Sequence, residues 1–242
     1  MQKALNLIRT LYTPGRWRAA ATWKPFSLSS FLMVTALQRQ GIAPNSIIDA
    51  GANAGQFSRA ALEVFPEANV LAFEPQPEVA AQWHQHIQGH DRAELIQAAL
   101  GSTDGTLRLH TNAYSLSTSA LPLHDNHLEA YPNATPSGTV DVPVHRLDTV
   151  LQNHTLPVPI LLKLDLQGYE LEALRGAEHT LQRVQYVLLE SSFKPLYQGE
   201  PLFDEVYAFM RDRGFRLLRP VGWMVGQADE ILQADLLFER QG

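Results

Sequence analysis

Acidic residues end several short apolar runs of this sequence, where carboxylates can do chemistry. Glu74 ends "NVLAFE" (69–74) and Asp165 ends "PILLKLD" (159–165). If these runs are parallel strands, their carboxyl ends meet at one edge of a sheet, which is where ligands bind in α/β proteins. A carboxylate there can accept hydrogen bonds from ligand hydroxyls or take a proton from a reacting group. The sequence therefore predicts a polar ligand site at this edge.

A glycine-rich turn, "DAGANAG" (49–55), follows the first apolar run. Gly51 and Gly55 remove side chains where a ligand must approach the backbone, and the amides of the next helix face the same space. We expect Asp49, Gly51, Asn53 and Gly55 to form the floor of a ligand pocket. The alternative is a tight turn that needs glycine only for its backbone angles.

Glu74 lies 23 positions after Gly51, at the end of the next apolar run. An acid at about this distance accepts both hydroxyls of a ribose and does not suit a 2′-phosphate. The alternative is an exposed acid that caps a helix. The turn has the spacing D-x-G-x-N-x-G instead of G-x-G-x-x-G, so it fits NAD poorly. Taken together, turn and acid predict a nucleoside site.

Four residues are candidates for catalysis: Lys163, Asp165, Glu190 and His145. Lys163 and Asp165 share one face of a strand, and a lysine inside an apolar run is costly to bury unless Asp165 or Glu190 pairs with it. A structural ion pair is the equal alternative for Lys163. Asp165 and Glu190 could share proton transfer, bind acceptor hydroxyls or hold a divalent metal, although spacing alone does not encode a metal and we claim none. His145 is a weaker candidate base, because a lone histidine is more often a packed or surface residue.

These candidates need a sheet to bring them together. Continuous apolar runs that alternate with helical stretches indicate strands buried on both faces of a parallel sheet. We expect a doubly wound α/β fold with a mostly parallel, seven-stranded sheet and an antiparallel hairpin insertion. The expected strands are 46–50, 69–74, 93–98, 159–165, 185–191, 214–220 and 234–240, the expected helices are 28–41, 56–65, 77–88 and 171–184, and the hairpin is 105–111 with 139–147.

Composition limits the class of protein. The chain has 242 residues, 45% of them hydrophobic and 18% charged, as in a globular protein with a sizeable core. The absence of cysteine excludes disulfides and cysteine nucleophiles. A net charge of -6 argues against nucleic acid as the main partner. No run is long enough to span a bilayer and no signal peptide is evident, so we expect a cytoplasmic protein.

Charge divides the chain into a basic N-terminal arm (1–45) and an acidic domain (46–242). The first acid is Asp49, and six basic residues precede it. Within the arm, "ALNLIRTLY" (4–12) has helical spacing. We expect this helix to pack on the domain or on a second copy of the chain in a homodimer. Contact with an anionic membrane surface is the alternative.

Nine segments in order then resemble one family: "IDAGANAGQFS", "AFEPQPE", "AALGSTDG", "SLSTS", "VHRLDTVL", "LLKLDLQGYELEALRGA", "LESSFKPLYQGE", "RDRGFRLL" and "QADLLFER". They are similar to the FkbM family of S-adenosylmethionine-dependent methyltransferases over residues 46–240, and the first 45 residues show no match. The resemblance implies a Rossmann-like fold, S-adenosylmethionine as cofactor, and O-methylation of a sugar or natural product. It also implies that the glycine turn lies against the amino-acid part of the cofactor, and we expect Ala98 to present its backbone to the adenine.

Methyl transfer from a sulfonium donor is an in-line displacement, so the protein supplies positioning and removes the proton of a hydroxyl acceptor. Asp165 is the favoured residue for the second task. The loops 114–119 and 191–199 are rich in hydroxyl and aromatic side chains that would grip a carbohydrate, or are ordinary polar loops. Two other functions use the same turn: an NAD-dependent oxidoreductase or epimerase, whose usual Tyr-x-x-x-Lys pair is absent, and a non-catalytic protein that binds S-adenosylmethionine.

Overall fold

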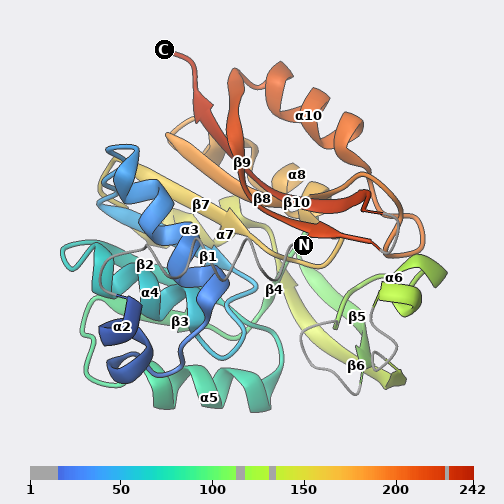
Figure 1. Ribbon diagram of the computed structural model, residues 1–242, viewed down its shortest axis with the longest axis horizontal. Coiled ribbons are helices and arrows are strands. Elements are labelled where there is room, and N and C mark those ends of the chain that lie inside the picture. The colour runs from blue at the N-terminus through green and yellow to red at the C-terminus, as the bar shows by residue number, and fades with distance from the viewer. Residues whose placement is uncertain (1–15, 113–117, 131–134, 227–228) are drawn as a thin grey trace.

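The computed structural model describes residues 16–112, 118–130, 135–226 and 229–242 (Figure 1). Its centre is a seven-stranded sheet with the order β3-β2-β1-β7-β8-β10-β9. The strands are β1 (Ser46–Ala50), β2 (Asn69–Phe73), β3 (Ala93–Ile96), β7 (Ile160–Leu164), β8 (Tyr186–Ser192), β9 (Phe215–Val225) and β10 (Ile231–Arg240). The helix expected over 4–12 and most of the loop 114–119 lie outside the described residues.

Strand pairing brings the expected acids to one edge. β1 pairs in parallel with β2 and β7, and β7 pairs in parallel with β8. β10 runs antiparallel to both β8 and β9. Asp49 is directly opposite Lys163 in the register of β1 and β7. The prediction of a mostly parallel, seven-stranded sheet is therefore confirmed.

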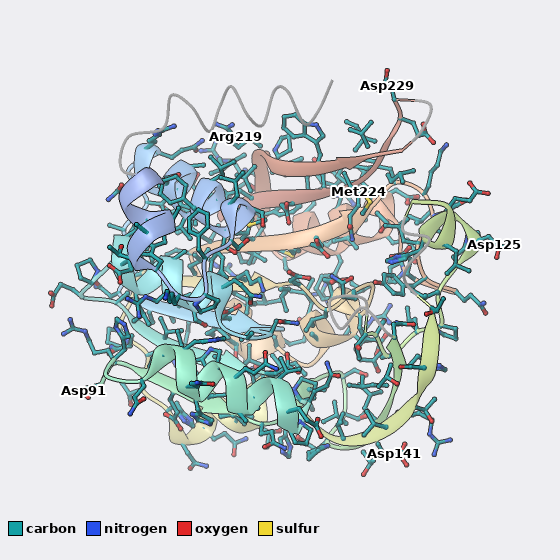
Figure 2. The ribbon with its side chains drawn as sticks, turned by 60° about the horizontal axis from the view of Figure 1, so that its bottom comes forward. Asp91, Asp125, Asp141, Arg219, Met224 and Asp229 are labelled. Carbon is teal, nitrogen blue, oxygen red and sulfur yellow. The ribbon has the colours of Figure 1, made fainter. Side chains whose placement is uncertain are left out.

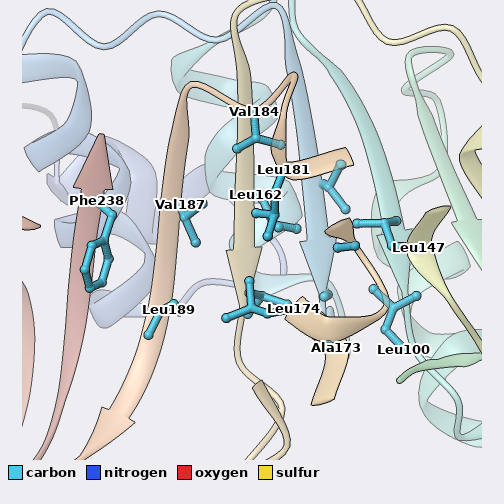
Figure 3. Close-up of a cluster of buried hydrophobic side chains, with 14 of the residues drawn as sticks. Leu100, Leu147, Leu162, Ala173, Leu174, Leu181, Val184, Val187, Leu189 and Phe238 are labelled. Carbon is cyan, nitrogen blue, oxygen red and sulfur yellow. The ribbon is translucent and has the colours of Figure 1, made fainter. Parts of the chain in front are cut away.

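Helices cover both faces of this sheet, as Figure 1 shows for α3, α4 and α5 on one side and for α8 and α10 on the other. Neighbouring strand residues point to opposite faces. Ile47 and Leu161 pack in one hydrophobic cluster with residues of α3 and α4. Ile48 and Leu162 point to the other face and belong to a second cluster, with residues of α8 and α10. Figure 3 shows part of that second cluster, between β7, β8 and β10. The helical elements are α2 (Arg16–Thr22), α3 (Leu28–Arg39), α4 (Gln56–Val64), α5 (Pro77–Ile87), α6 (Asp125–Ala130), α7 (Leu147–Val150), a 3-10 turn (Leu151–Asn153), α8 (Glu170–Arg175), α9 (Glu178–Leu181) and α10 (Phe203–Asp212).

The helix expected over 171–184 is two short helices, and the physical reason is a close approach of main chains. A Cβ on Gly176, between α8 and α9, would lie 2.0 Å from the carbonyl oxygen of Gly101. The chain bends there to pass Gly101, and α9 then begins beside Asp148, which accepts hydrogen bonds from the backbone of His179 and Thr180 at 3.0 and 2.8 Å. Sequence periodicity carries no information about such a contact.

The expected hairpin forms a second, three-stranded sheet of β4 (Ala99–Leu100), β5 (Gly105–Asn112) and β6 (Pro136–His145). β5 and β6 pair antiparallel, and β4 joins β6 in parallel. Leu109, Val142 and Val144 form a small core of their own with Ala99. In Figure 1 this sheet and α6 lie at the lower right, beside the main sheet.

The described part of the N-terminal arm packs on the domain. Val34 and Leu37 of α3 are fully buried in the same cluster as Ile47 and Phe57. Ser27 caps α3 by accepting a hydrogen bond from the backbone of Ser30 at 3.3 Å. The division of the chain at residue 45 remains a prediction. None of the helices in the described ranges combines the length and apolar character needed to cross a bilayer.

Candidate active site

A pocket of about 600 Å³ opens at the carboxyl ends of β1, β2, β7 and β8. Its wall combines the glycine turn, the second sheet and residues of β9 and β10, including Met224, which is labelled in Figure 2. The predicted site residues that line it are Gly51, Asn53, Glu74, Ala98, Lys163, Asp165 and Glu190. Figure 2 labels four acids on the outside of the molecule, Asp91, Asp125, Asp141 and Asp229, all of them exposed. The acids of the pocket are instead half-buried or buried.

Gly51 begins the turn after β1 with a φ of +74°, a region that glycine adopts without strain. A Cβ on Gly51 would lie 2.0 Å from the carbonyl oxygen of Asp165. The backbone amides of Gly51 and Ala52 donate to the carbonyl of Phe73 at 3.0 and 2.9 Å. The glycine is thus required by the close approach of β7 as well as by the pocket, which its backbone lines.

Asp49 and Gly55 support the turn from behind, which corrects the expectation that they face a ligand. Neither is among the described residues that line the pocket. Asp49 is fully buried, accepts a hydrogen bond from Ser58 Oγ at 2.6 Å and pairs with Lys163 Nζ at 3.0 Å. A Cβ on Gly55 would meet the ring of Trp83 at 3.1 Å. Their positions are therefore explained by packing.

Glu74 is 4% exposed and follows β2 directly. Its Oε2 accepts from the backbone amide of Asn53 at 3.1 Å, and its Oε1 accepts from that of Gln76 at 2.9 Å. Burial raises the pKa of Glu74, while these two donors lower it. Asn53 has a φ of +48°, which asparagine tolerates better than most residues. The carboxylate is fixed in place with lone pairs left for ligand hydroxyls.

Lys163 is a buried cation, 6% exposed, at the end of β7. Its Nζ lies 3.0 Å from Asp49 Oδ1 and donates to the carbonyl of Gly51 at 3.0 Å, whereas Asp165 Oδ2 is 3.7 Å away. Burial lowers the pKa of Lys163, but the charges of Asp49 and Asp165 more than offset this and raise it above its ordinary value. A lysine that keeps its proton cannot act as a base. The structure supports the ion-pair interpretation, with Asp49 as the main partner.

Asp165 and Glu190 meet through the side-chain amide of Gln167. Gln167 Nε2 donates to Asp165 Oδ1 at 2.7 Å and to Glu190 Oε2 at 3.0 Å. Gln233 Nε2 also donates to Glu190 Oε2, at 3.2 Å. Burial and the nearby negative charge of Asp165 raise the pKa of Glu190 well above its usual range. Glu190 therefore favours its protonated form while it shares the amide of Gln167 with Asp165.

Sequence reasoning missed two polar residues of the same region. Asp235 of β10 lines the pocket, and burial together with the charge of Asp165 raises its pKa to about 7. Tyr197 is fully buried and donates its hydroxyl to Gln167 Oε1 at 2.5 Å. The sequence could have indicated Asp235, because it is an acid within an apolar run. Lys163 was selected on the same ground, as a base within an apolar run. Tyr197 was marked only as part of the loop 191–199.

The histidine of the pocket is His127, not His145. His145 ends β6, where its Nδ1 lies 3.3 Å from Asp104 Oδ1, and its side chain is 42% exposed. It is not among the described residues that line the pocket, and its contact with Asp104 is half-exposed instead. His127 of α6 is 3% exposed and lines the pocket with its ring centroid 5.2 Å from that of Tyr197. Burial lowers the pKa of His127.

The two predicted rim loops contribute unequally. In the loop 191–199, Leu196 and Tyr197 line the pocket. Residues 114–117 of the other loop lie outside the described residues, whereas Thr118 and Ser119 line the pocket. Ser119 Oγ donates to the carbonyl of Gln167 at 2.6 Å. Across the ranges that the structure describes, no three His, Asp or Glu side chains are grouped so that they could hold a metal ion.

Comparisons with known proteins find methyltransferases among the proteins similar to this chain. The sequence is 29% identical over 161 residues to the 2-O-methyltransferase NoeI of Sinorhizobium fredii, covering 64% of this chain and 66% of NoeI, slightly less than two thirds. It is 27% identical over 128 residues to the hexuronic acid methyltransferase AglP of Haloferax volcanii, covering 51% of this chain and 47% of AglP. The crystal structure of magnesium protoporphyrin IX methyltransferase from Synechocystis with bound SAM superimposes with a TM-score of 0.49 at 11% identity, covering 88% of this chain and 78% of that one.

The Methyltransferase FkbM domain family matches residues 49–217. This match covers more than half of the chain. The matched region runs from the glycine turn through β7 and β8, and it includes Glu74, Asp165 and Glu190. The chain, with its turn, its buried Glu74 and its carboxyl pair, belongs to the FkbM methyltransferase domain family.

Proposed function

We propose that this protein transfers a methyl group from S-adenosylmethionine to a hydroxyl of a sugar or natural-product acceptor. Membership of a methyltransferase family supports the type of reaction. One observation carries the rest: a single pocket has a fixed carboxylate, Glu74, at one end and the Asp165–Glu190 pair at the other. The first end suits the hydroxyls of a nucleoside, and the second suits a hydroxyl that must lose a proton.

The residues at the first end fit S-adenosylmethionine. Glu74 would hold the ribose hydroxyls with the lone pairs that its two backbone donors leave unused, and Ala98 would flank the adenine with its backbone. Asn53 and Gly51 would face the amino-acid part of the cofactor. The cofactor supplies an already activated methyl group. The chain has only to bind it, orient the acceptor and deal with the acceptor proton.

The same residues fit NAD less well. NAD carries a pyrophosphate, which needs backbone amides or cations for its negative charge. Among the described residues that line the pocket, Lys163 is the only lysine or arginine, and its charge is paired with Asp49 at 3.0 Å. This supports a cofactor without phosphate over the oxidoreductase alternative.

Asp165 is the proposed base for the acceptor hydroxyl, with Glu190 beside it as a proton-holding partner. Holding donor and acceptor in line accounts for up to ~7–11 kcal/mol of a barrier when groups are well oriented. Proton transfer by a positioned carboxylate adds about 10²–10⁴ in rate. The relatives NoeI and AglP, named as a 2-O-methyltransferase and a hexuronic acid methyltransferase, support a sugar as the acceptor.

Two experiments test the proposal in order. Melting curves are recorded with S-adenosylmethionine and with NAD separately, because a ligand that binds only the folded state raises the melting temperature. Transfer of a labelled methyl group is then measured on a panel of sugars, glycosides and hydroxylated natural products. Label in a base-stable ether supports hydroxyl methylation, whereas base-labile label indicates a carboxyl ester. Tight binding of S-adenosylmethionine without transfer to any acceptor favours the non-catalytic alternative.

Location and assembly remain predictions. A cytoplasmic location is checked by cell fractionation, and a homodimer by light scattering on the purified protein. The net charge of -6 supports a small acceptor over nucleic acid. The predicted contact of the arm with a membrane surface involves residues 1–15, which lie outside the described residues.

A further inference from the structure

We propose that Gln167 is the positioning residue of the acceptor end: its side-chain amide holds Asp165 and Glu190 as one hydrogen-bonded unit, and Tyr197 fixes the direction of that amide. The inference rests on the proposed function, because the unit matters only if these carboxyl groups handle an acceptor proton. It assigns a role to a residue that no pattern in the sequence singles out.

The side-chain amide of Gln167 makes three hydrogen bonds, to Asp165, Glu190 and Tyr197. Its Nε2 donates to Asp165 Oδ1 at 2.7 Å and to Glu190 Oε2 at 3.0 Å, and its Oε1 accepts from Tyr197 at 2.5 Å. The two carboxyl groups come from different elements, since Asp165 follows β7 and Glu190 lies in β8. The amide therefore binds both carboxyl groups at once, in addition to the direct interaction between Asp165 and Glu190.

The direction of the amide follows from chemistry. The tyrosine hydroxyl fixes this direction, because its donation to Oε1 of Gln167 leaves Nε2 to face the two acids. Burial and the charge of Glu190 raise the pKa of Tyr197, which keeps its proton and donates it to that carbonyl. A reversed amide would place its oxygen against carboxylate oxygens and leave the buried tyrosine hydroxyl without its acceptor.

The backbone indicates that the side chain is what the position requires. Gln167 has a φ of +55°, a conformation that glycine adopts at lower cost. The turn is held by other contacts, including the hydrogen bond from Ser119 Oγ to the carbonyl of Gln167 at 2.6 Å. Glycine would make this turn more readily but could not bridge the two acids.

Donated hydrogen bonds favour the ionised form of a carboxyl group and lower its pKa. They act here against burial and like charge, which raise the pKa of Glu190. Losing the amide should therefore raise the pH at which the pair gives up its proton. The charged or titratable groups that surround the pair are Lys163, Glu170, Tyr197, Glu200 and Asp235.

The test uses Gln167→Gly, which relieves the backbone and removes the amide. Protonated carboxyl groups are followed by their infrared carbonyl band from pH 5 to 9, and the variant Glu190→Gln identifies the band of the pair. We expect Gln167→Gly to stay folded, because the relieved backbone offsets part of the cost of leaving the Tyr197 hydroxyl without its acceptor. Its titration should move up by about 1 to 2 pH units, the order expected for a lost hydrogen bond to a charged group.

Two methionine variants form a matched pair of controls. Gln167→Met keeps the length of the side chain and loses both donated bonds, whereas Gln233→Met loses only the bond to Glu190 at 3.2 Å. The first should shift the titration clearly more than the second. Tyr197→Phe should shift it in the same direction as Gln167→Met, because it frees the amide to turn.

The outcomes separate this inference from the proposed function. The infrared titration needs neither donor nor acceptor, so an unchanged titration in both Gln167→Gly and Gln167→Met overturns the inference whatever the activity. A shifted titration in a wild-type protein that transfers no methyl group supports the bridge and counts against the proposed function alone. With an active protein, the acid limb of kcat should move with the titration while KM for S-adenosylmethionine stays constant.

Discussion

The two ends of the pocket treat buried acids in opposite ways. At the β1–β2 end, Asp49 has Lys163 and Ser58 as partners, and Glu74 has two backbone amides. At the β7–β8 end, Asp165, Glu190 and Asp235 face one another, and like charge and burial raise the pKa of the last two. The first arrangement fixes a shape, and the second keeps protons exchangeable near neutral pH. A pocket that must hold a cofactor and activate a hydroxyl needs both.

The largest effect is expected where the two ends touch. Gly51→Val should prevent stable folding, because even a Cβ would lie 2.0 Å from the carbonyl of Asp165. The loss in free energy of unfolding should be on the order of 4 kcal/mol or more. Gly41→Ala is the matched control, since Gly41 also has a positive φ, +77°, but has nothing within 4 Å of its Cβ position. Urea unfolding compares the two, and similar losses would mean that the contact with Asp165 is not the cause.

Asp165→Asn should break the acceptor end alone. Removing the charge of a general base should lower kcat by about 10²–10⁴ and leave the affinity for S-adenosylmethionine nearly unchanged. Stability should change little, because Lys163 keeps Asp49 at 3.0 Å as its closer partner. Turnover and melting temperature are measured on one sample. A normal rate with a lowered melting temperature would assign Asp165 a structural role and leave Glu190 as the next candidate.

The acceptor end should also make stability depend on pH. Burial raises the pKa of Glu170, which accepts a hydrogen bond from the backbone amide of Leu166 next to Asp165, to about 8. Between its ordinary pKa and pH 8 the folded state binds a proton that the unfolded state has lost, so stability falls as pH rises, by up to about 1.4 kcal/mol per unit. Glu170→Gln should flatten this fall, and its amide oxygen can still accept the bond from Leu166 N. Thermal unfolding at pH 5, 6.5 and 8 checks the slope, and parallel curves for both proteins would contradict the assignment.

Glu74→Ala tests the cofactor end with the smallest expected effect. Losing hydrogen bonds to a carboxylate should weaken binding of S-adenosylmethionine by ~1.5–3 kcal/mol. Glu78→Ala is the control, because Glu78 is an exposed acid on α5. Calorimetric titration gives both affinities. Equal affinities in the two variants would remove Glu74 from the proposed ribose site.

The order of strands and helices was predictable because buried parallel strands are continuously apolar. The partner of Lys163 was not, since the sequence suggested Asp165 or Glu190 and the closer acid is Asp49. That pair depends on β1 lying next to β7 in register, and sheet order is not written in any local pattern. Nor was the position of His145 predictable, because its side chain pairs with Asp104 and is not among the described lining residues.

Some residues of the candidate site could be selected from the sequence, and others could not. Glu74 and Asp165 end apolar runs, so position along the chain was enough to select them. Gly55 was selected with Gly51 by type alone, yet only Gly51 lines the pocket, because what each glycine approaches is a tertiary matter. Gln167 is not singled out by any pattern in the sequence, and Tyr197 is marked only as part of the loop 191–199. Their roles arise from hydrogen bonds between segments that are 30 residues apart.

The passage of Gly176 over Gly101 bears on how freely this fold can vary. One wall of the pocket, with Leu107 and Leu109, stands on the second sheet, and two main chains in contact join that sheet to the helical layer. Side chains on β5 and β6 can therefore be exchanged to suit a different acceptor without disturbing the joint. A side chain at Gly176 would collide with the carbonyl oxygen of Gly101 and force the two main chains apart. The main-chain contact between Gly176 and Gly101 therefore constrains the sequence, whereas the side chains that line the pocket on the second sheet are free to vary.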